Sequence, residues 1–214
     1  MGIHQTLIGG YAGADSSDWV VTNHNSGSGD FTVPASSLQT NDLIVFAAGS
    51  DSSNPIINIF SSFSVTTLEN GNTNSIQHDI KYGVVPATPS DIEGRFSFTD
   101  YALIMGFRRS GSTSSYNVST EATTTTTTSP SHNNTSVAFS QDDLALLLAF
   151  VDDDATPMTP PTDSTKIAED QDNNRGSIGA AYKQIDTAGN YSWGSWTTSG
   201  TDNTLAFVIK IQEA

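Results

Sequence analysis

Short apolar runs and polar, turn-forming stretches alternate along the whole chain. The two strongest runs, residues 43–48 and 144–151, are apolar at nearly every position. A strand of this kind is covered on both faces, as in the middle of a packed sandwich. The polar residues that flank both runs favour this interpretation over a short buried helix. Alternation at residues 95–99 predicts a further strand, with Phe96 and Phe98 on one face.

Turn signals separate the predicted strands. Asn70-Gly71 predicts a tight turn, and the charged stretch 169–176 predicts a longer loop at the equivalent place in the second half. The threonine-rich stretch 123–128 predicts an exposed edge strand or loop, because threonine favours extended backbone. Many short strands with this punctuation and no helical period predict an all-β, antiparallel sandwich or jelly roll.

The apolar pattern occurs twice. Asp42-Leu43 begins the first strong run and Asp143-Leu144 begins the second, an offset of 101 residues (from 42 to 143). The apolar run at 102–107 returns at 204–209, an offset of 102 residues (from 102 to 204). Runs that return in the same order predict duplication of a unit of about half the chain.

The repeat also predicts the domain organisation. We expect two tandem, jelly-roll-like antiparallel β-sandwich domains, residues 1–109 and 110–214, related by internal duplication. The Gly- and Ser-rich stretch at 110–115 has the composition of a linker between them.

The charge and composition of the chain exclude several classes of function. The chain carries 23 acidic and 8 basic side chains, a formal net charge of −15. Such a field repels phosphate backbones, so we expect no nucleic-acid partner. The sequence contains no cysteine, which excludes disulfides and thiolate metal sites. No apolar run reaches the roughly 18–20 residues of a membrane span. The first residues lack signal-peptide features, so we expect synthesis in a host cytoplasm and no membrane partner.

Recognisable catalytic motifs are missing from the sequence. The four histidines, His4, His24, His78 and His132, do not have metal-ligand spacing. The sequence holds no nucleophile elbow, phosphate-binding loop or dinucleotide fingerprint. We therefore expect no catalytic residues, no cofactor and no enzymatic activity.

One acidic stretch is a candidate calcium site. Asp170, Asp172 and Asn174 stand at alternate positions before Gly176, and oxygen ligands at alternate positions of a tight loop suit calcium. The glycine is one place late for an EF-hand loop, and the twelfth position is Ala181. The alternative interpretation is a solvated acidic hairpin tip.

An aromatic cluster is a candidate glycan site. Tyr191 and Trp193 align with Phe96 and Phe98 of the first half, which predicts that they belong to the core. Trp196 has the opposite parity to Trp193 and is expected to face solvent unless Gly194 hosts a bulge. An exposed indole on a β-sandwich can stack on a sugar ring, so Trp196 is the candidate ligand-binding residue.

The order of motifs in the second half resembles a module of tailed-phage virion proteins. The motifs are Asp142-Asp143-Leu144, Pro160-Pro161-Thr162, Ala181-Tyr182-Lys183, Tyr191-Ser192-Trp193 and the closing strand at 205–211. The first half keeps Asn41-Asp42-Leu43 and Lys81-Tyr82 but lacks the Pro-Pro, and the Gly-Trp that often follows the Pro-Pro is missing in both halves.

The resemblance implies a tandem β-sandwich structural protein of a virion, of the capsid decoration (knob) or tail-fibre type. The implied partners are capsid or tail proteins of the same particle, with the chain present as a homo-oligomer or in many copies. A glycan-binding module for host attachment is the first alternative, and a surface-layer or adhesion domain is the second.

Overall fold

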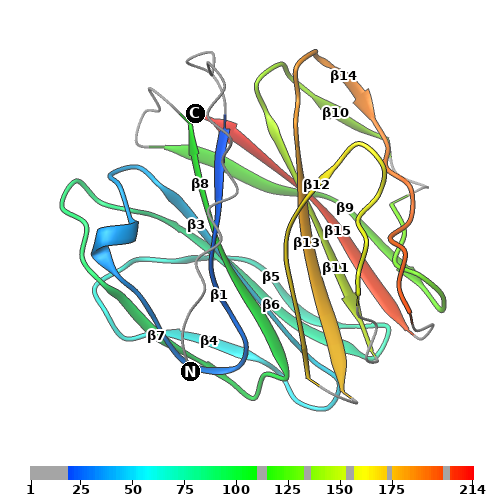
Figure 1. Ribbon diagram of the computed structural model, residues 1–214, viewed down its shortest axis with the longest axis horizontal. Coiled ribbons are helices and arrows are strands. Elements are labelled where there is room, and N and C mark those ends of the chain that lie inside the picture. Colours follow the sequence, from blue (N-terminus) through cyan, green and yellow to red (C-terminus); the bar gives the residue numbers. More distant parts are fainter. Residues whose placement is uncertain (1–18, 110–114, 133–135, 153–156, 173–174, 200–202) are drawn as a thin grey trace.

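The computed structural model describes residues 19–109, 115–132, 136–152, 157–172, 175–199 and 203–214 (Figure 1). These residues form β-strands and one short 3-10 helix, Ala35–Ser37, so the predicted all-β class is confirmed. The paired strands of the sheets are antiparallel, as expected. Within these ranges no helix has the length and apolarity that a membrane crossing requires.

The first half of the chain forms two sheets. The larger has five strands, in the spatial order β1 (Trp19–Ser26), β8 (Tyr101–Arg109), β3 (Leu43–Ser50), β6 (Ile76–Val84) and β5 (Thr66–Thr73). The smaller has three strands, in the order β2 (Gly29–Val33), β7 (Ile92–Ser97) and β4 (Ile56–Ile59).

The second half also forms one large and one small sheet. The larger has five strands, in the order β12 (Thr165–Asp172), β13 (Gly176–Gln184), β11 (Leu144–Val151), β15 (Thr204–Glu213) and β9 (Tyr116–Thr126). The smaller pairs β10 (Val137–Phe139) with β14 (Gly189–Tyr191). The predicted threonine-rich edge strand is β9, which covers residues 123–126 of that stretch and lies at the end of its sheet.

The two five-stranded sheets have the same strand order. Read from the opposite end, β9-β15-β11-β13-β12 matches β1-β8-β3-β6-β5 strand by strand along the chain. The duplication itself remains a prediction about how this order arose. The strand register shows which residues of the two halves correspond. Leu43 pairs with Phe107 in the first half, and Leu144 pairs with Ile211 in the second. The last strands therefore correspond at an offset of 104 residues (from 107 to 211), and not at the predicted 102.

The sheets stack in four layers, with the two five-stranded sheets in the middle (Figure 1). The largest core lies between these two sheets and combines side chains of both halves, such as Leu103 and Phe107 with Leu146 and Phe207. The small sheet of each half covers the outer face of its large sheet, over two further cores. Residues 1–109 and 110–214 thus share their largest core, and the predicted boundary adjoins residues 110–114, which lie outside the described ranges.

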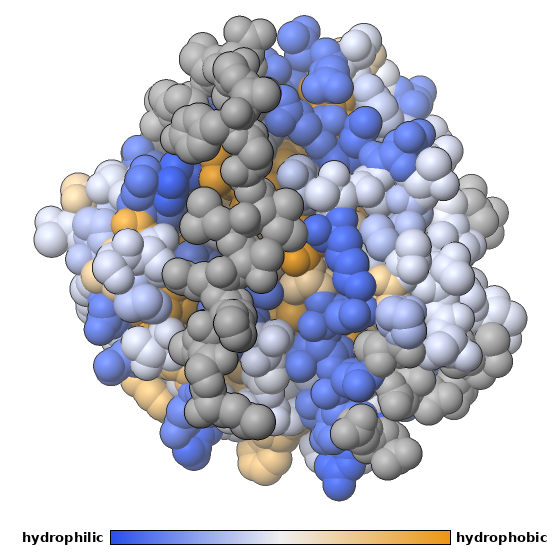
Figure 2. All heavy atoms as spheres, in the orientation of Figure 1, coloured by the Kyte–Doolittle hydropathy of each residue, from blue (hydrophilic) through white to orange (hydrophobic). Residues whose placement is uncertain are grey.

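The central strands β3 and β11 explain the two strongest apolar runs. All eight residues of each strand are buried, because one face meets the opposite large sheet and the other meets the small sheet. The prediction that both faces are covered is confirmed. The surface that Figure 2 shows is mostly hydrophilic or intermediate, with apolar side chains in small patches.

The repeated Asp-Leu motif is a repeated turn. Asn41 and Asp142 both adopt left-handed backbone, with φ of 69° and 70°. The next carboxylate in each half, Asp42 or Asp143, accepts the backbone N–H three residues earlier, at 2.8 and 2.7 Å. Each carboxylate therefore closes the turn that leads into a central strand.

Two local predictions are wrong. Asn70 and Gly71 lie inside β5, and the turn to β6 is at Asn74 and Ser75, where φ is 53° and 68°. The Asn74 side chain donates hydrogen bonds to two carbonyls of the second half, which fixes the turn there. Phe98 does not share the face of Phe96, since its φ is 55° and the chain leaves β7 for the other sheet at that point.

Candidate functional site

The predicted calcium loop is largely strand. β12 continues through Asp172, so Asp170 and Asp172 are strand residues, whereas Asn174 lies outside the described residues. Asp170 Oδ2 accepts the backbone N–H of Ala102, at 2.9 Å, and thereby joins the second half to the first. Burial raises the pKa of Asp170, opposed by the backbone N–H of Ala102. Among the described residues, no group of three or more His, Asp or Glu side chains could hold a metal ion.

The expectation that Trp196 faces solvent is wrong. Its side chain is 1% exposed, and its Nε1–H donates to Nε2 of His132 at 3.2 Å. Residues 193–197 make only isolated bridges, such as Ser131 with Ser195, in place of a regular strand, so strand alternation does not set the direction of Trp196. In this conformation the indole cannot stack on a sugar. Trp193 is buried, as predicted, and Tyr191 stacks against it with ring centres 6.1 Å apart.

The three histidines in the described ranges do not assemble into a site. His24, His78 and His132 belong to separate parts of the fold, and His4 lies outside the described residues. Burial lowers the pKa of each of the three, and that of His132 falls to about 4. His78 lies between the two large sheets beside Phe150 and Phe207, with ring centres 6.3 and 5.2 Å away.

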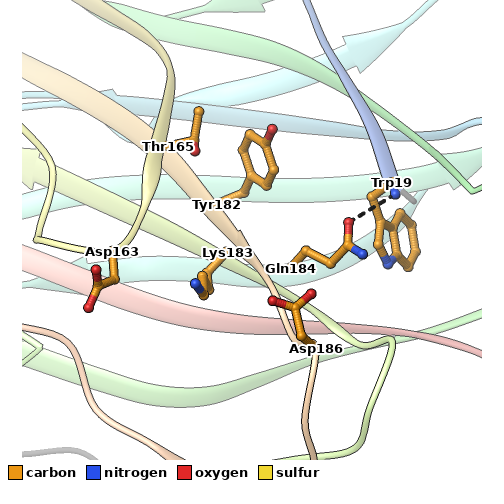
Figure 3. A pocket seen from close by; sticks show the side chains of 7 residues that line it. All are labelled: Trp19, Asp163, Thr165, Tyr182, Lys183, Gln184 and Asp186. Atoms are coloured by element: carbon orange, nitrogen blue, oxygen red, sulfur yellow. Dashed lines mark hydrogen bonds between the residues drawn. The ribbon is translucent and has the colours of Figure 1, made fainter. Parts of the chain in front are cut away.

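An open groove of about 370 Å³ lies where β1 of the first half meets β12 and β13 of the second (Figure 3). Trp19 fixes the junction, because its backbone N–H donates to Oε1 of Gln184 at 3.2 Å and its indole N–H donates to the carbonyl of Asp142 at 2.8 Å. The groove is lined by Trp19, Asp163, Thr165, Tyr182, Lys183, Gln184 and Asp186.

The groove offers both hydrogen-bond donors and hydrogen-bond acceptors. Asp163 and Asp186 are exposed carboxylates, Lys183 supplies an ammonium group, and the Tyr182 ring is half-buried. An open, polar groove with one aromatic wall suits a hydroxyl-rich ligand. The sequence does not signal this site, because Trp19 is separated from the other lining residues by more than half the chain and no motif joins them.

No family model, curated protein or solved structure matches this chain.

Proposed function

We propose that this protein is a non-enzymatic virion structural protein that decorates the exterior of a capsid. The observation that carries the proposal is the core shared by the two five-stranded sheets. It joins two sandwiches into one thick body of four layers, a form suited to a building block. The motif order that resembles tailed-phage virion proteins supports the same class.

The surface chemistry is consistent with this role. A net charge of −15 keeps particles that carry many copies of the chain apart in solution. The same charge disfavours contact with the packaged nucleic acid. The protein is made in the host cytoplasm and then binds the assembled shell. Because it binds the assembled state alone, it stabilises the particle by mass action.

Co-sedimentation tests the proposal. Particles assembled from a genome that lacks this reading frame are mixed with increasing amounts of the purified chain, at physiological and at high salt. Saturable binding with a fixed copy number per shell is the expected result. If the chain stays in the supernatant at every concentration, the decoration role is wrong.

A glycan-binding attachment module is the second candidate, and the groove in Figure 3 favours it. The groove would take the place of Trp196 as the sugar site, with Tyr182 as the stacking ring. Binding of the chain to host polysaccharide is the readout. The double variant Asp163→Ala with Asp186→Ala should abolish binding, whereas Asp91→Ala, an exposed carboxylate outside the groove, should not.

A further inference from the structure

The exposed large apolar side chains are unevenly distributed. Among the described residues they are Val20, Ile56, Phe60 and Phe98, and all belong to the first half. Three of these four lie along one small sheet. Ile56 begins β4, Phe60 follows its end, and Phe98 follows the end of β7, the neighbour of β4. Single exposed apolar residues are ordinary, but a cluster on one element marks a contact surface.

Register places Ile56 and Phe98 at one end of β4 and Phe60 at the other end. Ile56 pairs with Ser97, which precedes Phe98, and the N–H of Phe60 bonds the carbonyl of Glu93 at the other end of β7. Ile57 and Ile59 turn inward to the core, so the alternation of the strand sends Ile56 outward. Phe60, just past the end of β4, is exposed. We call Ile56, Phe60 and Phe98 the β4 ridge.

Phe98 is the most unusual member of the ridge. Its side chain is 68% exposed, and that of Phe60 is 64% exposed. The φ of Phe98 is 55°, a value that bulky residues rarely adopt and that Gly or Asn would adopt with less strain. The ring belongs to neither core of the first half. Strained, protruding side chains cluster at contact sites, where a partner supplies the packing that the free chain lacks.

The ridge does not offer a free strand edge at its centre. Asp79 Oδ2 accepts the N–H of Ile57 and Lys81 Nζ donates to its carbonyl, both at 2.9 Å. These two side chains of β6 occupy the outer edge of β4. A partner therefore meets the ridge through side chains and does not add a strand to the sheet.

We propose that the β4 ridge is the surface by which the protein docks on its shell, with the second half turned outward. The partner is a shell protein that presents an apolar depression rimmed by Lys or Arg. The exposed carboxylate of Glu93 belongs to the residue whose carbonyl accepts the N–H of Phe60, whereas Arg95 is neutralised by Asp30. A second copy of this chain fits poorly, because each copy carries a charge of −15. This inference rests on the proposed function.

The same sedimentation assay tests the ridge, with variants of the full chain. The double variant Phe60→Asn with Phe98→Asn removes both rings, and Asn tolerates the backbone at position 98. Val20→Asn is the matched control, since Val20 is 49% exposed but lies on β1, outside the ridge. Phe98→Gly is a second variant, expected to fold at least as well as the wild type because glycine relieves the left-handed backbone.

We expect the double variant to raise the apparent Kd for the shell by about thirtyfold or more, the loss typical of a hot-spot aromatic. Val20→Asn should bind as the wild type does. Equal binding of the wild type and the double variant would overturn the ridge and leave the proposed function standing. Failure of the wild type itself to bind would overturn both. Self-association of the wild type in the ultracentrifuge, lost in the double variant, would overturn the assigned partner in favour of a second copy.

Discussion

Arg108 holds the carboxylate of Asp42 through two hydrogen bonds, of 2.5 Å from Nε and 2.7 Å from Nη2. The same carboxylate closes the turn before β3. In the second half Asp143 closes the equivalent turn, but its partner is the neutral amide of Gln212, at 2.9 and 3.1 Å. At this position one half of the fold has an ion pair, and the other half has a carboxylate bonded to a neutral amide.

The two halves should respond differently when the carboxylate is removed. Asp42→Ala leaves the partly buried Arg108 without its counter-charge, and we expect the free energy of unfolding to fall by about 3 kcal/mol. Asp143→Ala leaves only neutral groups and should cost about 1–2 kcal/mol. Urea unfolding at neutral pH measures both. Equal losses would mean that the turn hydrogen bond, and not the ion pair, dominates at both positions.

Tyr101 occupies the space above Gly49, close to the opposite sheet. A Cβ at Gly49 would lie 2.2 Å from Cε2 of Tyr101 and 2.9 Å from Cδ1 of Phe150. Gly49→Ala should therefore force the two large sheets apart locally and lower the free energy of unfolding by about 1–3 kcal/mol. Gly71→Ala is the control, because its nearest contact would be 3.7 Å, to His78. A similar melting temperature for both variants would show that the Tyr101 ring moves aside without cost.

The apolar pattern predicts the strands well and the packing between sheets poorly. Runs such as 43–48 show that both faces of a strand are covered. They cannot show that one cover is the other half of the chain, because burial by any apolar surface leaves the same pattern. For this reason the pattern does not predict the core shared by the two large sheets.

The wrong predictions at single positions each have a local physical cause. Asn70-Gly71 is a strong turn signal, yet the turn forms at Asn74, where a side chain reaches carbonyls of the second half. Parity placed Phe98 and Trp196 on the wrong sides, because parity holds only within a continuous strand. Phe98 follows the end of β7, and Trp196 lies in a segment of isolated bridges. The groove beside Trp19 joins residues from both halves, so no local pattern marks it.

Asp170 is a half-buried carboxylate whose charge should reduce stability. Its pKa is raised by burial, so the folded state holds a proton more tightly than the unfolded chain does. Protonated Asp170 contributes its full stabilisation below the ordinary pKa of an aspartate. This contribution is lost as pH rises through the pKa of Asp170 in the folded state. Asp170→Asn keeps an acceptor for Ala102 and does not ionise. We expect it to be more stable than the wild type at pH 7, with the difference vanishing near pH 3.

Glu93→Gln is the control for the lowered net charge, because Glu93 is exposed on the three-stranded sheet. Its stability relative to the wild type should not follow the same pH profile. The measurement is the urea midpoint at several pH values, with and without calcium. A calcium-dependent rise in the wild type that Asp170→Asn lacks would instead support the calcium hypothesis for Asp170 and Asp172.

His132 should make the protein sensitive to mild acid. The ring is 1% exposed, and burial lowers its pKa from 6.5 to about 4. Between these values the unfolded chain takes up a proton that the folded chain does not. Stability is therefore full above pH 6.5 and falls as pH drops to about 4, by about 3 kcal/mol if the whole shift is expressed.

His132→Gln isolates this effect, because the Gln carbonyl can accept from Trp196 Nε1 and does not titrate in this range. Its stability should fall less than that of the wild type between pH 7 and pH 4. The stability of the variant still falls somewhat as pH drops, because burial also lowers the pKa of His24 and His78. Tryptophan fluorescence during urea unfolding at each pH gives both curves. Parallel curves for the variant and the wild type would show that His132 does not contribute to acid sensitivity.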